Sequence, residues 1–297
     1  MPIGDQAVLS AGQVNVEGFF DTATSTVSYI VSDPETGSCA IIDPVLDYSA
    51  RSGRTDTASA DRLIEHVRNK DLNVRWILET HVHADHLTSA PYLQSELGGQ
   101  TAIGGNVVAV QEVFAEAFHA GESFSKDGSQ WDILVTEGQE LELGNATIKV
   151  METPGHTPAC VSYQIADAVF VGDTIFMPDY GTARCDFPGG DADILFTSVQ
   201  RILTLPDETR VFTCHDYGGE GRDFSWESSV ASQRQDNVHL GGDKSRFDFV
   251  TLRQSRDAGL QLPELILPSV QVNMRAGVFP PAEENGVSYI KIPLNKF

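Results

Sequence analysis

The segment THVHADH, residues 80–86, constrains this chain of 297 residues more than any other part of its sequence. It follows an apolar run that predicts a short buried strand, and it holds four metal-ligand side chains within six positions. Alternate residues of an extended segment point the same way, so His81 and His83 can face one metal ion. Asp85 and His86 follow where a helix would begin, and both can turn toward the same pocket. The segment therefore predicts a metal site rather than a solvated polar loop.

Residues of metal-ligand type also follow three later predicted strands: His156, Asp173 and His215. Each stands at the C-terminal end of its strand, where loops from different strands converge on one rim. A single histidine in a loop is more often a surface residue, and a single aspartate after a strand more often caps a helix. The common position of these residues adds them to the predicted site. Other histidines, in predicted helices or near the helical tail, are expected to be structural: His66, His119 and His239.

The order of the predicted elements indicates an α/β fold. The elements fall into two halves, each of strands followed by helices, which favours two packed sheets with helices outside. Beyond residue 220, helices and then a short strand over residues 287–292 are predicted. No shift in composition separates this part of the chain. We therefore expect one domain over residues 1–297, with a core at about 10–220 and a helical C-terminal extension over 221–297.

The charge of the chain argues against some classes of partner. Lys and Arg number 20 against 42 Asp and Glu, which gives a formal net charge of −22. Such a surface repels phosphate backbones and anionic lipid, so neither a nucleic-acid nor a membrane partner is expected. The first residues lack a signal-peptide pattern, and no run reaches the ~18 apolar residues of a spanning helix. We expect a cytoplasmic protein with reduced thiols, because the cysteines show no paired spacing: Cys39, Cys160, Cys185 and Cys214.

The ligand pattern resembles that of the metallo-β-lactamase superfamily over about residues 10–220. It consists of His81-x-His83-x-Asp85-His86, then Gly155-His156-Thr157, Gly172-Asp173 and Cys214-His215-Asp216. The resemblance implies an αββα sandwich of two mixed β-sheets flanked by helices, with the metal at one sheet edge. This agrees with the two halves predicted from the residues themselves.

Shorter runs resemble the persulfide dioxygenases, the ethylmalonic encephalopathy protein group. They are HADHLTSA (83–90), GHTPAC (155–160), ARCDF (183–187), HDY (215–217) and NMRAG (273–277). The glyoxalase II branch prefers a bulky residue where this chain has Ala84. Two departures from the dioxygenase pattern are expected to reshape the pocket: a longer segment over 48–60, and two extra residues between Asp173 and Arg184.

The narrower resemblance implies a non-haem iron enzyme. His81, His156 and Asp173 would form a facial triad on one Fe(II) per chain, with positions left open for reactants. Such an enzyme oxidises glutathione persulfide with O2 to sulfite and glutathione, in sulfide detoxification. Iron is needed because triplet O2 reacts slowly with closed-shell sulfur. The remaining ligand-type residues would orient the triad and hold water: His83, Asp85, His86 and His215.

The same residues also suit two Zn(II) ions. His81, His83 and His156 would hold one ion, Asp85, His86 and His215 the other, and Asp173 would bridge them. A bridging hydroxide would then attack a thioester such as an acylglutathione, as in glyoxalase II. A non-enzymatic metal or thiol sensor is a third hypothesis, but it predicts an incomplete ligand set and none of these residues is missing.

Substrate recognition in so acidic a protein requires local cations, because glutathione carries two carboxylates. Arg184 and Arg275 match positions in the family's runs, and Arg234 lies in the extension, so these residues are predicted to bind substrate. Tyr217 is predicted to donate a hydrogen bond from the same rim. Cys160 and Cys185 are expected to be apolar fillers. A homodimer is expected from the general frequency of dimers alone.

Overall fold

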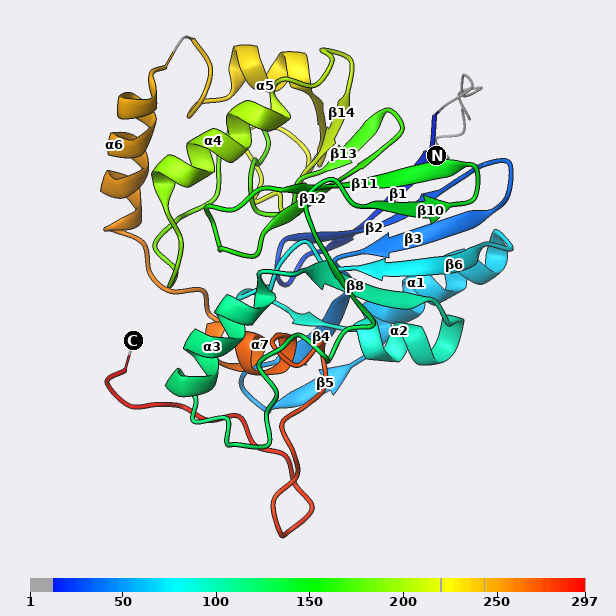
Figure 1. Ribbon diagram of the computed structural model, residues 1–297, viewed down its shortest axis with the longest axis vertical. Helices are drawn as coiled ribbons and strands as arrows, with labels where there is room; N and C mark the ends of the chain where they lie inside the picture. The colour runs from blue at the N-terminus through cyan, green and yellow to red at the C-terminus, as the bar shows by residue number, and fades with distance from the viewer. Residues whose placement is uncertain (1–12, 220, 243, 297) are drawn as a thin grey trace.

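Two six-stranded sheets lie face to face at the centre of the computed structural model, which describes residues 13–219, 221–242 and 244–296 (Figure 1). In the first sheet β1, β2 and β3 pair antiparallel, whereas β3, β6, β8 and β9 pair parallel. The strands of this sheet, in spatial order, are β1 (Asn15–Asp21), β2 (Thr26–Ser32), β3 (Ser38–Ile42), β6 (Asn73–Leu78), β8 (Gln100–Gly104) and β9 (Ile133–Val135).

The second sheet is antiparallel except for the parallel pair β13 and β14. Its strands, in spatial order, are β10 (Glu140–Leu143), β11 (Ala146–Glu152), β12 (Val161–Ile165), β13 (Ala168–Phe170), β14 (Arg210–Phe212) and β15 (Glu227–Ser229). Apolar side chains from both sheets share one core, in which Tyr29 and Tyr163 are among the largest fully buried residues. The Tyr163 hydroxyl donates to the carbonyl of Glu79 at 2.9 Å and so joins the second sheet to the end of β6.

Helices cover the outer faces of the sheets, as the sequence predicts (Figure 1). Apolar side chains of α1 and α2 pack on the first sheet, and those of α4 and α6 pack on the second. Strand β2 is buried at every position, because the core between the sheets lies on one of its faces and helices α1 and α2 lie on the other. The helices are α1 (Ala58–Asn69), α2 (Ala90–Leu97), α3 (Val107–Ala117), α4 (Ala192–Ile202), α5 (Val230–Asp236), α6 (Arg246–Asp257) and α7 (Ile266–Asn273). The αββα architecture of two mixed sheets is therefore confirmed.

Two segments singled out in the sequence take defined positions, and the prediction is wrong for the second. The longer segment near residues 48–60 contributes to a small third sheet made of β5 (Arg54–Asp56), β4 (Val45–Ser49) and β7 (Leu87–Thr88). The prediction of a strand over residues 287–292 is wrong, because these residues form no strand. Instead of a neighbouring strand, the side-chain amide of Gln271 on α7 hydrogen-bonds to the main chain of Lys291. It accepts from the N–H of Lys291 and donates to its carbonyl.

No helix in the described part of the chain is long and apolar enough to cross a membrane.

Candidate metal centre

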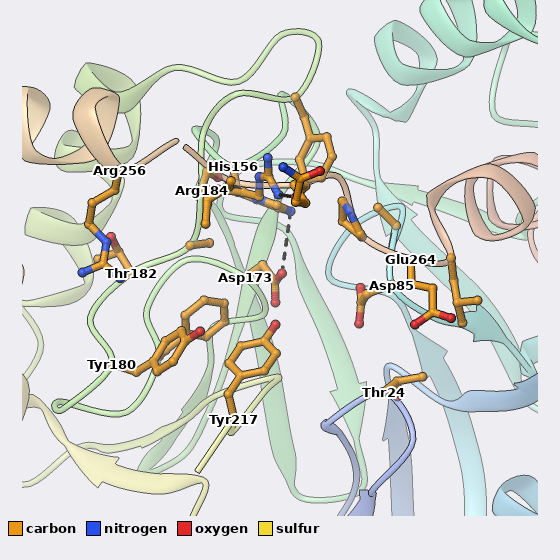
Figure 2. A pocket seen from close by; sticks show the side chains of 18 of the residues that line it. Thr24, Asp85, His156, Asp173, Tyr180, Thr182, Arg184, Tyr217, Arg256 and Glu264 are labelled. Carbon is orange, nitrogen blue, oxygen red and sulfur yellow. Dashed lines mark hydrogen bonds and ion pairs between the residues drawn. The ribbon is translucent and has the colours of Figure 1, made fainter. Parts of the chain in front are cut away.

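The predicted ligands converge at one end of the sandwich. His81 follows β6 of the first sheet, whereas His156, Asp173 and His215 follow β11, β13 and β14 of the second. All four side chains are buried. Figure 2 shows His156 and Asp173 facing each other across the pocket, with Asp85 beside them. The structure thus brings together residues that lie up to 134 positions apart between His81 and His215, because each is attached to a strand end at the same rim.

Three of these residues form one compact group. One ligand atom from each of His81, His156 and Asp173 lies within 4.8 Å of the other two. The Oδ2 atom of Asp173 is 4.0 Å from Nε2 of His81 and 3.7 Å from Nε2 of His156. Burial lowers the pKa of His81 well below its ordinary value, and the nearby imidazoles of His83 and His156 lower it further. The ring is therefore neutral and has a lone pair available for a metal.

A glycine places Asp173 against the first sheet. Gly172 has a φ of +49°, and a Cβ at this position would lie 2.5 Å from Oγ1 of Thr80. Only glycine combines this left-handed conformation with such a close approach. Thr80 immediately precedes His81, so the contact fixes the distance between the strand ends that carry His81 and Asp173.

The other predicted ligands lie beside the compact group without joining it. Nε2 of His215 is 3.2 Å from Oδ2 of Asp85 and 3.3 Å from Oδ1 of Asp173. His83, Asp85 and His86 form a separate group of close ligand atoms. Among the described residues, no such group contains both His86 and His215, whose ring centroids are 6.5 Å apart.

The histidines are prepared for metal binding, because each has one ring nitrogen anchored by the protein. Nδ1 of His156 contacts the carbonyl of Arg184 at 2.7 Å, and Nδ1 of His215 contacts that of Ser25 at 3.2 Å. Anchoring one nitrogen fixes the ring and its tautomer and aims the other nitrogen at the metal. Buried atoms without a hydrogen-bond partner in the described structure include Nε2 of His81, Nδ1 of His83, Nε2 of His86, Nε2 of His215 and Oδ1 of Asp173. These residues fit a bound metal.

Two buried carboxylates that sequence reasoning missed hold His83. Its Nε2 lies 3.0 Å from Oδ1 of Asp43 and 3.4 Å from Oε2 of Glu79. Burial alone would lower the pKa of His83, but these carboxylates raise it well above its ordinary value. Asp43 also accepts from the main-chain and side-chain donors of Thr80, at 2.7 and 2.8 Å. Both acids directly follow strands, Asp43 after β3 and Glu79 after β6, but this position alone does not show that they contact His83.

The C-terminal part of the chain anchors the metal-binding loop. Asn273, the last residue of α7, donates from Nδ2 to the carbonyls of His83 and His86, at 2.9 and 2.7 Å. Its Oδ1 accepts from the N–H of Thr88 at 2.9 Å. Asn273 belongs to the NMRAG run of the sequence, and its physical role is to clamp the HVHADH loop.

A cavity of about 450 Å³ opens above the compact group. Its volume falls within the range of ordinary small-molecule sites. Arg184 and Tyr217, which are predicted to bind substrate, line it together with His156, Asp173 and Asp85. The hydroxyl of Tyr217 remains protonated, because partial burial and the carboxylates of Asp173 and Asp85 raise its pKa well above the ordinary value.

The predicted substrate arginines differ in position. Arg184 is in the cavity wall, but its guanidinium is bound to both oxygens of Asp186, each at 2.6 Å. Arg234 and Arg275 are not among the residues that line the cavity. The guanidinium of Arg234 binds the carbonyls of Leu203 and Leu205, and that of Arg275 lies over the ring of Phe124.

The cysteines are free and buried in the described structure. Burial raises the pKa of Cys39 and of Cys160 to about 12, and it raises the pKa of Cys185 and Cys214 as well. A thiol in this state is a poor nucleophile. This agrees with the prediction that Cys160 and Cys185 are apolar fillers. The histidine at position 239, predicted to be structural, instead lines the cavity.

Comparisons with known proteins agree with this architecture. Residues 21–215 match the model of the metallo-beta-lactamase superfamily. A probable metallo-hydrolase of Burkholderia pseudomallei is 54% identical over 95% of this chain and 99% of its own length. Glyoxylase B2 of Dictyostelium discoideum is 47% identical over 96% of this chain and 98% of its own length.

Proteins with a dioxygenase name are more distant. The human mitochondrial persulfide dioxygenase ETHE1 is 28% identical over 92% of each chain. The crystal structure of ETHE1 from Myxococcus xanthus superposes with a TM-score of 0.70, at 31% identity, and covers 89% of this chain and 100% of that one. The relatives near 50% identity thus carry hydrolase-type names, and the dioxygenases lie near 30%. On the family match, the ligand clusters and the fold together, this chain belongs to the metallo-β-lactamase superfamily.

Proposed function

We propose that this protein is a persulfide dioxygenase that uses one Fe(II) ion held by His81, His156 and Asp173. The observation that carries the proposal is the grouping of ligand atoms. His81, His156 and Asp173 form one such group, whereas the residues needed for a second ion fall into two groups among the described residues, His86 with His83 and Asp85, and His215 with Asp173 and Cys214. A set of two histidines and one carboxylate is typical of non-haem Fe(II) oxygenases.

The reaction converts glutathione persulfide, O2 and water into glutathione, sulfite and two protons. The outer sulfur loses four electrons and O2 gains them, and water supplies the third oxygen of sulfite. Iron, when bound, supplies the redox chemistry that lets triplet O2 react with sulfur. The likeness to ETHE1 from Myxococcus xanthus and to human persulfide dioxygenase supports this substrate class.

The side chains of the chain itself orient and enclose the reactants. The carbonyl of Arg184 fixes the ring of His156, and the rings of His156 and Phe187 pack in a T-shaped arrangement at a centroid distance of 5.2 Å. The Tyr217 ring stacks on His215 at 5.5 Å and presents a protonated hydroxyl to the cavity. This hydroxyl is placed to donate a hydrogen bond to an anionic sulfur or oxygen of the reactants.

A dinuclear zinc thioester hydrolase of the glyoxalase II type is a second candidate. Two observations favour it. The unpartnered nitrogen of His83 is available to the first ion and those of His86 and His215 to a second, and the more similar relatives carry hydrolase-type names. In that enzyme Asp43 would accept the Nε2–H of His83 while Nδ1 faces the metal.

Two measurements on the purified protein distinguish the candidates. Metal analysis should find one iron per chain, and glutathione persulfide under air should cause O2 uptake with one sulfite formed per O2. Two zinc ions per chain, with hydrolysis of an acylglutathione and no O2 uptake, would replace the dioxygenase by the hydrolase. The variant His156→Ala should lose both the metal and the activity, because it removes one member of the compact group.

A further inference from the structure

Among the described residues, the cavity wall formed by α6 and its surroundings contains an arginine, Arg256, whose guanidinium has no protein partner. Arg184 and Arg253 also line the cavity, but each is paired with a carboxylate, Arg184 with Asp186 and Arg253 with Asp257. The side chain of Arg256 makes no hydrogen bond or ion pair with any other residue in the part of the chain that the structure describes. Arg256 is exposed, and in a chain with a net charge of −22 an arginine in a cavity wall, without a carboxylate partner among the described residues, suits an anionic ligand.

A buried histidine supplies a second, independent feature of the same wall. The side chain of His239 is only 3% exposed, and its Nδ1 accepts from the N–H of Thr182 at 2.9 Å. The ring proton is therefore on Nε2, which has no hydrogen-bond partner among the described residues, although His239 lines the cavity. An unpaired buried N–H is costly to leave unsatisfied. Nε2 itself is buried, within a side chain that forms part of the cavity wall.

The surroundings of His239 fix this orientation. The ring packs against Gly181, where φ is +102° and a Cβ would lie 2.2 Å from Nδ1. Burial lowers the pKa of His239 to about 3, and the charges of Arg253, Arg256 and Lys244 contribute to the shift. The ring is therefore neutral at physiological pH and acts as a directed hydrogen-bond donor. Arg256, close enough to affect it, provides the positive charge.

We infer that Arg256 and Nε2–H of His239 form a subsite that binds a carboxylate of the thiol substrate. The inference rests on the proposed function, since it concerns the far end of the ligand whose sulfur lies at the metal. Figure 2 shows Arg256 and Thr182 on one side of Asp173, with Asp85 and Glu264 on the other. An anionic group is repelled by the acidic side and attracted to the Arg256 side, which orients the ligand in the cavity.

This assignment differs from the arginines that the sequence indicated. Arg184 is neutralised by Asp186, while Arg234 and Arg275 are absent from the cavity lining. Arg256 and His239 lie outside every motif quoted for the family resemblance, so only their position in the folded chain identifies them.

Calorimetric titration of the metal-loaded protein with glutathione and with glutathione diethyl ester tests the subsite. The ester keeps the thiol and the peptide but has no carboxylate. We expect wild-type protein to bind glutathione at least about 10-fold more tightly than the ester, since hydrogen bonds to charged groups are among the strong ones. Arg256→Ala and His239→Asn should each abolish most of this preference. Asn can still accept from the N–H of Thr182, but it does not reach the position of Nε2.

Two further variants control for charge and for folding. Arg246→Ala removes the same charge from the same helix, at a guanidinium bound to Asp193 outside the cavity lining, and should keep the preference. His239→Gln places an N–H near the position of Nε2 and should restore part of it. Thermal melts of all variants show whether each is folded.

Equal affinity of the wild-type protein for acid and ester, or no binding of glutathione, refutes the subsite. An unchanged preference in both Arg256→Ala and His239→Asn refutes it as well. The titration requires no turnover, so a protein without O2 uptake that still prefers the acid would keep the subsite and lose only the proposed function. Conversely, O2 uptake without this preference would leave the dioxygenase and remove the subsite.

Discussion

Replacing Asn273 by alanine should destabilise the protein and weaken its metal site together. The side chain is 3% exposed and serves three main-chain partners, the carbonyls of His83 and His86 and the N–H of Thr88. Leaving a buried hydrogen-bonding group unsatisfied costs about 1–3 kcal/mol. With three such groups, we expect the free energy of unfolding to fall by at least about 3 kcal/mol. Because the clamp supports the ligand loop, metal affinity should fall about 10- to 100-fold.

Gln271→Ala is the matched control for this prediction. Gln271 lies on the same helix, is also 3% exposed, and makes three hydrogen bonds, but its partners are Leu267 and Lys291. Urea denaturation should show a loss of stability in both variants, whereas competition with a chelating dye should show a loss of metal affinity only for Asn273→Ala. Equal metal affinity in the two variants would refute the clamp.

Three further predictions concern other contacts. Gly172→Ala introduces a Cβ against Thr80 at a left-handed φ, so the melting temperature and the bound metal per chain should both decrease, and unchanged metal content would contradict this. Removing the metal with a chelator should lower the melting temperature, because a ligand that binds only the folded state at about 1,000 times its Kd contributes about 4 kcal/mol; calorimetry checks this. Burial alone would raise the pKa of Asp216, but Arg222 and nearby N–H groups hold it below its usual value. This stability is therefore present above the unfolded pKa and lost as pH falls through the lower folded pKa. Asp216→Asn should be less stable at neutral pH and lose less on acidification, as followed by tryptophan fluorescence.

The ligand residues were predictable because their signal is local. His81, His83, Asp85 and His86 are close together in sequence, and each of the other ligands lies three or four residues after the end of a strand. The two-sheet architecture was predictable for a similar reason, since hydrophobic periodicity and turn residues lie within each element.

Residues that act from a distance were not predictable in this way. Asp43 reaches His83 across 40 positions, and Asn273 reaches it across 190. Neither distance leaves a periodic pattern in the sequence. The segment 287–292 shows the opposite error, a local pattern without the predicted structure. Its residues have the pattern of a strand, but the side chain of Gln271, rather than a neighbouring strand, hydrogen-bonds to the main chain of Lys291. Likewise, the sequence does not show that the guanidinium of Arg184 is paired with a carboxylate whereas that of Arg256 is free to bind a ligand, because the partners of each depend on the fold.

The ligands come from both sheets, and this has a mechanical consequence. His81 extends from the first sheet, whereas His156 and Asp173 extend from the second. A metal bound to all three is a cross-link between the two layers, in a protein whose described cysteines form no disulfide. Sliding of one layer over the other would pull the ligands apart, so the rate at which the metal dissociates reports how rigidly the two sheets are held together.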